Sequence, residues 1–136
     1  MSSIWARGGE THLQRAVLYG HEHKVLQLIE GDADVNVPVS DEGGRTALQA
    51  AAKLGSIHLV ELLLEKGAEV NAPASISNGR TSLQAAAEKG YFPIVELLLK
   101  EGAELNAPAS SVNGRTVLQA AAKNNNYPVV DLCSVL

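Results

Sequence analysis

Apolar residues occur along the chain in short blocks that glycine, proline and polar residues separate. One block covers residues 47–54 and the next covers residues 57–66. The apolar residues of the second block cover a wide face of one helix, as expected for a helix packed between neighbours; they are Leu59, Val60, Leu62, Leu63 and Leu64. The pattern predicts pairs of short helices. Because helices of this length are unstable alone, each pair must bury its apolar face against a neighbouring pair.

The blocks belong to an internal repeat. The motif Gly-Arg-Thr-x-Leu-Gln-Ala-Ala-Ala begins at Gly44, Gly79 and Gly114, a spacing of 35 residues. One further step back reaches Gly9, where threonine, leucine, glutamine and alanine stand in register. We therefore expect an N-terminal segment, a first unit that caps the stack, two full units and a truncated fourth unit. Their predicted ranges are 1–8, 9–43, 44–78, 79–113 and 114–136.

Each unit carries signals for where its helices begin and end. Thr46 and Gln49 form a Thr-x-x-Gln capping box, which satisfies free amides at a helix start. Gly55 follows the first helix, where a left-handed residue is favoured, and Gly67 closes the second. Asp32 holds the place of Gly67 in the first unit. The capping pair recurs as Thr11 with Gln14, Thr81 with Gln84 and Thr116 with Gln119.

These motifs carry a resemblance to a known family. The unit Gly-x-Thr-x-Leu-x-x-Ala-Ala, followed by Lys-Gly-Ala-Glu-Val-Asn-Ala at residues 66–72, resembles the ankyrin repeat. The resemblance implies an all-α ankyrin-repeat solenoid of four stacked helix-turn-helix units joined by extended, hairpin-like loops. The usual repeat has roughly 33 residues, and we place the two additional ones between Pro73 and Gly79. This 35-residue variant is similar to the ankyrin arrays of fungal multidomain proteins.

The resemblance also implies a function. Ankyrin arrays bind partner proteins through a concave surface made by the loop tips and the first helices, so we expect a monomeric protein-protein interaction module or scaffold. An alternative is the recognition arm cut from a larger multidomain signalling or enzymatic protein. By resemblance to the variable positions of the family, the predicted partner-binding residues are Tyr19, Arg45, Lys53, Leu54, Ile76, Arg80, Glu88, Lys89, Arg115 and Lys123.

Two interpretations of the repeated arginines stay open. Arg45, Arg80 and Arg115 could form a basic row that pairs with partner carboxylates. Alternatively, each arginine bonds neighbouring loop carbonyls or an acidic residue of the next repeat. The apolar Tyr19, Leu54 and Ile76 do not repeat and are expected at the surface, where they resemble interface anchors. For the asparagines at positions 36, 71 and 106, the resemblance implies bonds to loop backbone.

Composition argues for one class of fold and against two classes of partner. The 136 residues suit one domain, and 46% hydrophobic with only 4% aromatic residues favours helices packed through small side chains. The net charge of −4 argues against a nucleic-acid partner. The apolar runs are too short to cross a bilayer, which argues against a membrane partner. The single Cys133 cannot form an internal disulfide, so an intracellular location, cytoplasmic or nuclear, is expected.

The sequence contains no recognisable catalytic set. His12, His21, His23 and His58 lack the further ligands that a zinc site needs, so they are interpreted as exposed. No phosphate-binding glycine motif is present, and we expect neither an enzyme nor a cofactor or metal site. The last residues, 132–136, are largely apolar. They predict an array continued in a longer protein or, alternatively, end-to-end contact through an uncapped last repeat.

Overall fold

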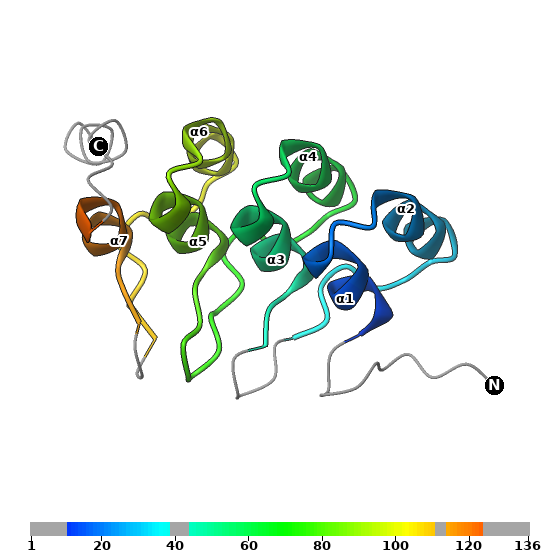
Figure 1. Ribbon diagram of the computed structural model, residues 1–136, viewed down its shortest axis with the longest axis horizontal. Helices are drawn as coiled ribbons and strands as arrows, with labels where there is room; N and C mark the ends of the chain where they lie inside the picture. Colours follow the sequence, from blue (N-terminus) through cyan, green and yellow to red (C-terminus); the bar gives the residue numbers. More distant parts are fainter. Residues whose placement is uncertain (1–10, 39–43, 111–113, 124–136) are drawn as a thin grey trace.

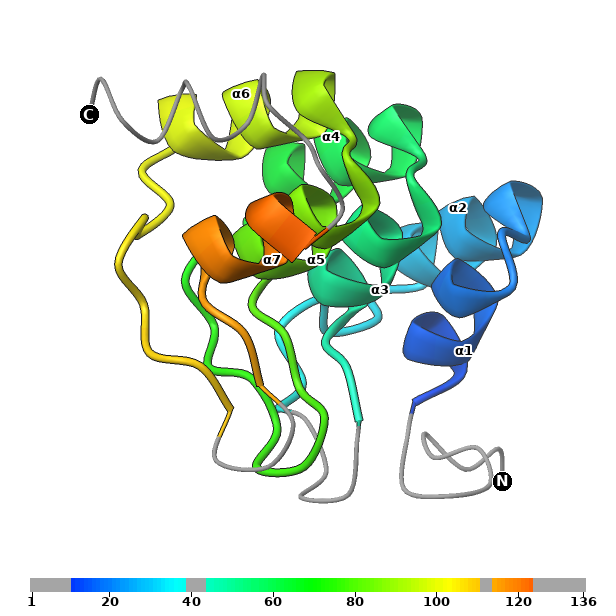
Figure 2. The ribbon, with the colours of Figure 1, turned by 60° about the vertical axis from the view of Figure 1, so that its left-hand side comes forward.

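Helices in consecutive pairs form the described part of the chain. The computed structural model describes residues 11–38, 44–110 and 114–123. The helices are α1 (His12–Leu18), α2 (Glu22–Glu30), α3 (Ala47–Leu54), α4 (Ile57–Glu65), α5 (Ser82–Lys89), α6 (Phe92–Lys100) and α7 (Val117–Lys123). The first helices of the pairs, α1, α3, α5 and α7, stand in one row (Figure 1). The second helices, α2, α4 and α6, form another row, and extended loops project from the stack (Figure 2). This arrangement confirms the predicted all-α solenoid.

Every first helix begins with the predicted capping box. The Thr46 hydroxyl accepts from the Gln49 amide at 3.1 Å, and the Gln49 side-chain carbonyl accepts from the Thr46 amide at 3.1 Å. Two of the four amides that a helix start leaves free are satisfied in this way. The same reciprocal bonds join Thr11 with Gln14, Thr81 with Gln84 and Thr116 with Gln119.

The helix ends also follow the sequence signals. Gly55 adopts a left-handed conformation with φ 86°, and Asp32 takes φ 64° at the point where later units have glycine. A side chain at Gly55 would also collide with the Tyr91 ring, because an added Cβ would lie 2.5 Å from it. Helix α4 ends at Glu65, one residue before its predicted end, because Lys66 already leaves helical geometry with ψ 9°.

The core runs through the stack between neighbouring pairs. The alanine triplets at 50–52 and 85–87 are almost completely buried, and each first helix lies against the first helix of the next pair. The alanine triplets therefore lie where adjacent first helices pack against each other. Small side chains allow the close approach of the helix backbones. On α4, Leu59, Val60 and Leu63 are buried, while Leu62 and Leu64 at its edges are half-buried.

The capping glutamines have a second role that the sequence motif did not reveal. The Gln84 amide donates to the carbonyls of Ala107 and Pro108, both at 3.2 Å. Gln49 makes the equivalent bonds to Ala72 and Pro73 at 3.0 and 3.1 Å. Each of these glutamines therefore starts a helix and also fixes the loop that follows the second helix of its own unit.

The repeated asparagines join one unit to the next. The Asn71 amide donates to the Gly102 carbonyl at 2.9 Å, and its side-chain oxygen accepts from the Glu104 amide at 2.7 Å. Asn36 makes the same pair of bonds to Gly67 and Glu69. The expected bonds to backbone are therefore present for Asn36 and Asn71, and their acceptors and donors lie in the following repeat.

Some predictions fall outside the described residues. The segment 1–8, the start of the first unit at Gly9 and the C-terminal residues 124–136, including Cys133, are among them. The unit boundaries and the count of four units stay predictions. In the described ranges, no helix is long and apolar enough to cross a membrane.

Candidate functional site

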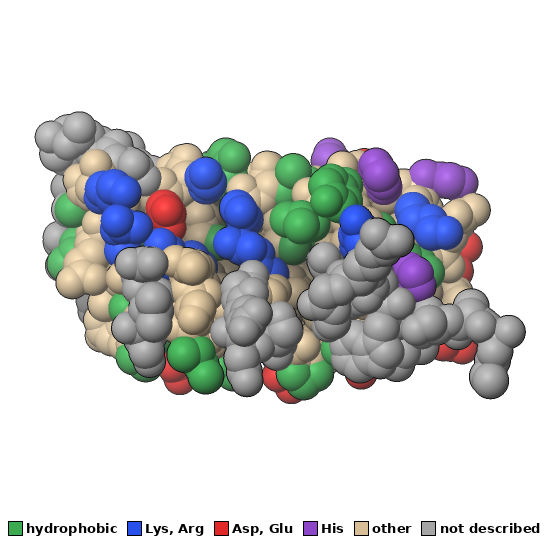
Figure 3. Space-filling model, turned by 60° about the horizontal axis from the view of Figure 1, so that its bottom comes forward, with side chains coloured by type: hydrophobic (Ala, Val, Ile, Leu, Met, Phe, Trp, Pro, Cys, Tyr) green, Lys and Arg blue, Asp and Glu red, His purple; other side chains and the backbone are tan. Residues whose placement is uncertain are grey.

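Most of the predicted partner-binding residues lie at the ends of the first helices or next to their starts. Lysine and arginine side chains are spaced along this side of the molecule (Figure 3). We name this region the first-helix surface, and Ile76 lies apart from it in the loop before α5. The surface comprises Tyr19, Arg45, Lys53, Leu54, Arg80, Glu88, Lys89, Arg115 and Lys123.

The glycines before Arg80 and Arg115 place their loops by close contact with backbone. A Cβ added to Gly79 would lie 2.3 Å from the Ser75 carbonyl oxygen, and one added to Gly114 would lie 2.1 Å from the Ser110 amide nitrogen. Neither glycine has a left-handed conformation. Glycine is therefore required here because two loop strands meet without room for a side chain, and not because of its φ angle.

Arg80 is bound by Glu88 of its own unit and by two carbonyls of the loop before α5. Its Nε donates to Glu88 at 2.6 Å, and its Nη1 donates to the carbonyls of Gly79 and Asn78 at 2.9 and 3.3 Å. The two charged side chains are only 11% and 26% exposed. This favours the structural interpretation of Arg80 over a free row of arginines. The alternative that Arg80 pairs with an acidic residue of the next repeat is wrong, because its partner Glu88 belongs to the same predicted unit.

Positive charges lie close together along the first-helix surface. Burial lowers the pKa of Arg45, the nearby Arg80 lowers it further, and Glu88 opposes the change. Burial likewise lowers the pKa of Lys53, followed by the charges of Arg45 and Lys89. These mutual effects show that cations from successive first helices lie close enough to repel one another.

Glu88 is the carboxylate within this group of cations. Burial alone would raise its pKa, but the hydrogen bond from Arg80 and the charges of Arg80, Arg115 and Lys89 outweigh burial and lower it. Glu88 is therefore ionised at neutral pH. It compensates part of the positive charge, and the surface keeps an excess of cations over carboxylates among the described residues.

Two exposed apolar side chains, Tyr19 and Leu54, lie at one end of the first-helix surface, and the exposed Ile76 lies in the loop before α5. Tyr19 is 60%, Leu54 40% and Ile76 56% exposed, which confirms their predicted exposure. An added Cβ at Gly20 would lie 3.4 Å from the Leu54 side chain, so Leu54 reaches the end of α1 beside Tyr19. Arg15 stands 5.8 Å from the centre of the Tyr19 ring. Such an apolar pair beside cations can bury area against a partner.

Sequence reasoning did not single out two further exposed leucines. Leu26 is 39% and Leu118 is 52% exposed. For Leu26 a signal existed, because the repeat aligns it with Glu61 and Glu96, which are exposed in α4 and α6. For Leu118 the repeat gave the opposite signal, since its equivalent Leu83 is buried.

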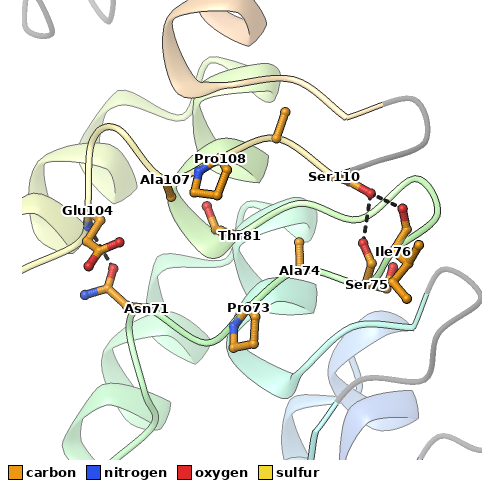
Figure 4. A pocket seen from close by; sticks show the side chains of 11 residues that line it. Asn71, Pro73, Ala74, Ser75, Ile76, Thr81, Glu104, Ala107, Pro108 and Ser110 are labelled. Atoms are coloured by element: carbon orange, nitrogen blue, oxygen red, sulfur yellow. Dashed lines mark hydrogen bonds between the residues drawn. The ribbon is translucent and has the colours of Figure 1, made fainter.

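Shallow cavities between neighbouring loops carry no recognisable chemistry. One has a volume of about 290 Å³, and its lining includes Asn71, Pro73 and Ser75 from one loop and Pro108 and Ser110 from the next (Figure 4). The Asn71 side chain already bonds the next repeat, and Ser110 bonds the carbonyl oxygens of the preceding loop. The four histidines are exposed. No group of residues suited to a metal ion occurs in the described ranges.

The repeated helix pairs, capping boxes and inter-repeat asparagines define an all-α repeat protein of stacked units. The family model for ankyrin repeats, in three copies, matches residues 3–74 and again residues 72–134. The chain therefore belongs to the ankyrin repeat family, whose repeats generally serve as protein-interaction modules. A search of the curated proteins found no match.

Proposed function

We propose that the chain is a protein-binding module whose partner contacts the first-helix surface. The observation that carries the proposal is the pairing of exposed apolar side chains with cations on one side of the stack. Tyr19 and Leu54 are exposed there, although Leu13, Leu48 and the alanines of the same first helices are buried. Interface centres combine apolar or aromatic anchors with arginine in this way.

Repeated residues and variable residues have different roles in the stack, and this difference supports the proposal. Residues that repeat in every unit, such as the threonines, glutamines and alanines of the first helices, are used in caps, loop bonds and helix contacts. Positions that vary, such as Leu54 and its counterpart Lys89, lie at the exposed ends of those helices. Variation at exposed positions on a regular scaffold is how repeat arrays acquire different partners.

A capture experiment with matched variants tests the proposal. Leu54→Asp alters the first-helix surface, and Leu26→Asp makes the same change at an equally exposed leucine on α2, in the other row of helices. Tagged wild type and both variants are incubated with cell extract, and bound proteins are quantified by mass spectrometry. Specific partners should be lost with Leu54→Asp and retained with Leu26→Asp. Equal retention by both variants would show that the binding surface lies elsewhere.

A further inference from the structure

Charge is segregated between the two rows of helices. Among the described residues, exposed acids occupy the second helices and the loops after them. They are Glu22, Glu30, Asp32, Asp34, Glu61, Glu65, Glu69, Glu96, Glu101 and Glu104. On the first-helix surface the charged residues are basic except for Glu88. Because the whole chain has a net charge of −4, this basic surface does not reflect a basic composition.

The cations repeat along the stack at defined positions. Arg45 and Arg115 follow equivalent turn glycines, and Lys53 and Lys123 occupy equivalent helix positions on either side of Glu88. Neighbouring packed helices lie about 8–10 Å apart. An extended peptide advances about 3.3 Å per residue. Three peptide residues therefore span about one step of the stack.

We propose that the first-helix surface binds an extended acidic segment of a partner protein, with carboxylates about three residues apart meeting the cations of successive units. An apolar residue at one end of that segment packs on Tyr19 and Leu54. The inference rests on the proposed function and gives the chemistry of its partner. Complementary charge also raises the rate of association, because the field of the surface attracts the acidic segment before contact.

Glu88 favours a peptide over a nucleic acid. Glu88 occupies the repeat position that Lys53 and Lys123 occupy in the neighbouring units, so a negative charge separates these two cations along the stack. A nucleic-acid strand carries a phosphate at every nucleotide and would bring one near this carboxylate. A peptide with carboxylates three residues apart can instead place the carboxylate of this step on the exposed Lys89 and its intervening uncharged residues opposite Glu88.

Two sets of lysines allow a matched test. Lys53, Lys89 and Lys123 lie on the first-helix surface, whereas Lys24, Lys66 and Lys100 lie in the second helices or at their ends. Replacing either set with glutamine removes the same charge from the chain. The probe is a fluorescein-labelled peptide with one leucine followed by glutamates at every third position, separated by serine and glycine. Binding to the full chain is measured by fluorescence anisotropy.

The first-helix triple variant should bind the probe about tenfold more weakly than wild type, since three ion pairs at the surface are lost. The second-helix triple variant should bind within twofold of wild type. A peptide with glutamine in place of every glutamate should bind at least tenfold more weakly. Equal loss in both triple variants, equal binding of the glutamine peptide, or tighter binding of a labelled oligothymidylate would overturn the inference.

Competition separates this inference from the proposed function. The unlabelled glutamate peptide is added to the capture experiment, and its effect is compared with that of Leu54→Asp. Displacement of the captured partners by the peptide supports both proposals. Loss of capture in Leu54→Asp without displacement by the peptide would leave the binding surface in place and reject an acidic segment as its ligand. Thermal melts of every variant check that each is folded.

Discussion

Helices α5 and α7 share the pattern Leu-Gln-Ala-Ala-Ala but differ in burial. Leu83 is 1% exposed, whereas its counterpart Leu118 is 52% exposed. Gln84 and Ala87 are buried, and their counterparts Gln119 and Ala122 are exposed. Helix α5 lies between α3 and α7, and α7 packs against α5. The same residues are therefore core or surface according to the neighbour that covers them.

The comparison divides each first helix into two stripes. On α7, Val117, Ala120 and Ala121 are buried, and they share one helix face. The exposed Leu118, Gln119 and Ala122 form the adjacent face. One stripe packs on the preceding unit and the other is available for the following unit. Burial in this fold is therefore a property of pairs of units.

The largest expected contrast is between the two leucines. Leu83→Ala leaves a cavity between packed helices and should lower the free energy of unfolding by about 2–5 kcal/mol. Leu118→Ala removes a half-exposed side chain and should cost about 1 kcal/mol or less. Urea denaturation, monitored by circular dichroism, measures the free energy of unfolding of both variants. Similar costs would mean that α7 is as well covered as α5.

Enlarging an alanine tests the same difference in burial by overpacking, where the leucine substitutions test it by leaving a cavity. Ala87→Leu forces a larger side chain into the buried contact of α5 and should destabilise the protein by about 1–3 kcal/mol. Ala122→Leu places the same side chain on an exposed position and should change stability by about 0.5 kcal/mol or less. Thermal unfolding of the two variants checks this pair. If both substitutions are tolerated equally well, the alanine contact is not close-packed.

A smaller contrast is expected for the glutamines. Gln84→Ala removes the capping bond and also leaves the Ala107 and Pro108 carbonyls without this donor, which should cost about 1–3 kcal/mol. Gln119→Ala removes an exposed capping bond and should cost about 1 kcal/mol. Chemical denaturation of both variants gives the difference. Equal losses would show that the bonds to the loop contribute nothing beyond capping.

The smallest effect concerns the charged end of α5, where Glu88 corresponds to Lys123 of α7. Because the folded state lowers the pKa of Glu88 below its ordinary value of 4.5, its ionised form stabilises the fold. That stabilisation is present above the unfolded pKa and is lost as pH falls through the lower folded value. The stability difference between wild type and Glu88→Gln should therefore shrink on acidification below about pH 4.5. A difference that is constant from pH 7 to pH 3 would contradict the lowered pKa.

Local features of the fold could be predicted from the sequence. The bounds of α3, the capping boxes and the left-handed Gly55 depend on residues within a few positions of one another. The repeat then transferred each prediction to the other units. The exposure of Tyr19 and Leu54 could also be predicted, because these positions depart from the repeated pattern.

Contacts between distant residues could not be predicted in this way. The loop bonds of Gln84 reach 23 and 24 residues along the chain, and the bonds of Asn71 reach into the next unit. The Arg80–Glu88 pair depends on how the loop enters α5. The exposure of Leu118 depends on its neighbours, which its own pattern does not encode.

Amide hydrogen exchange tests most directly whether each unit is stabilised by the units on both sides of it. Helices covered on two sides should open only with the whole domain, whereas a helix covered on one side opens locally at lower cost. The account predicts slow exchange for the amides of α3 and α5 and markedly faster exchange for those of α7. Protection of α7 equal to that of α5 would contradict it.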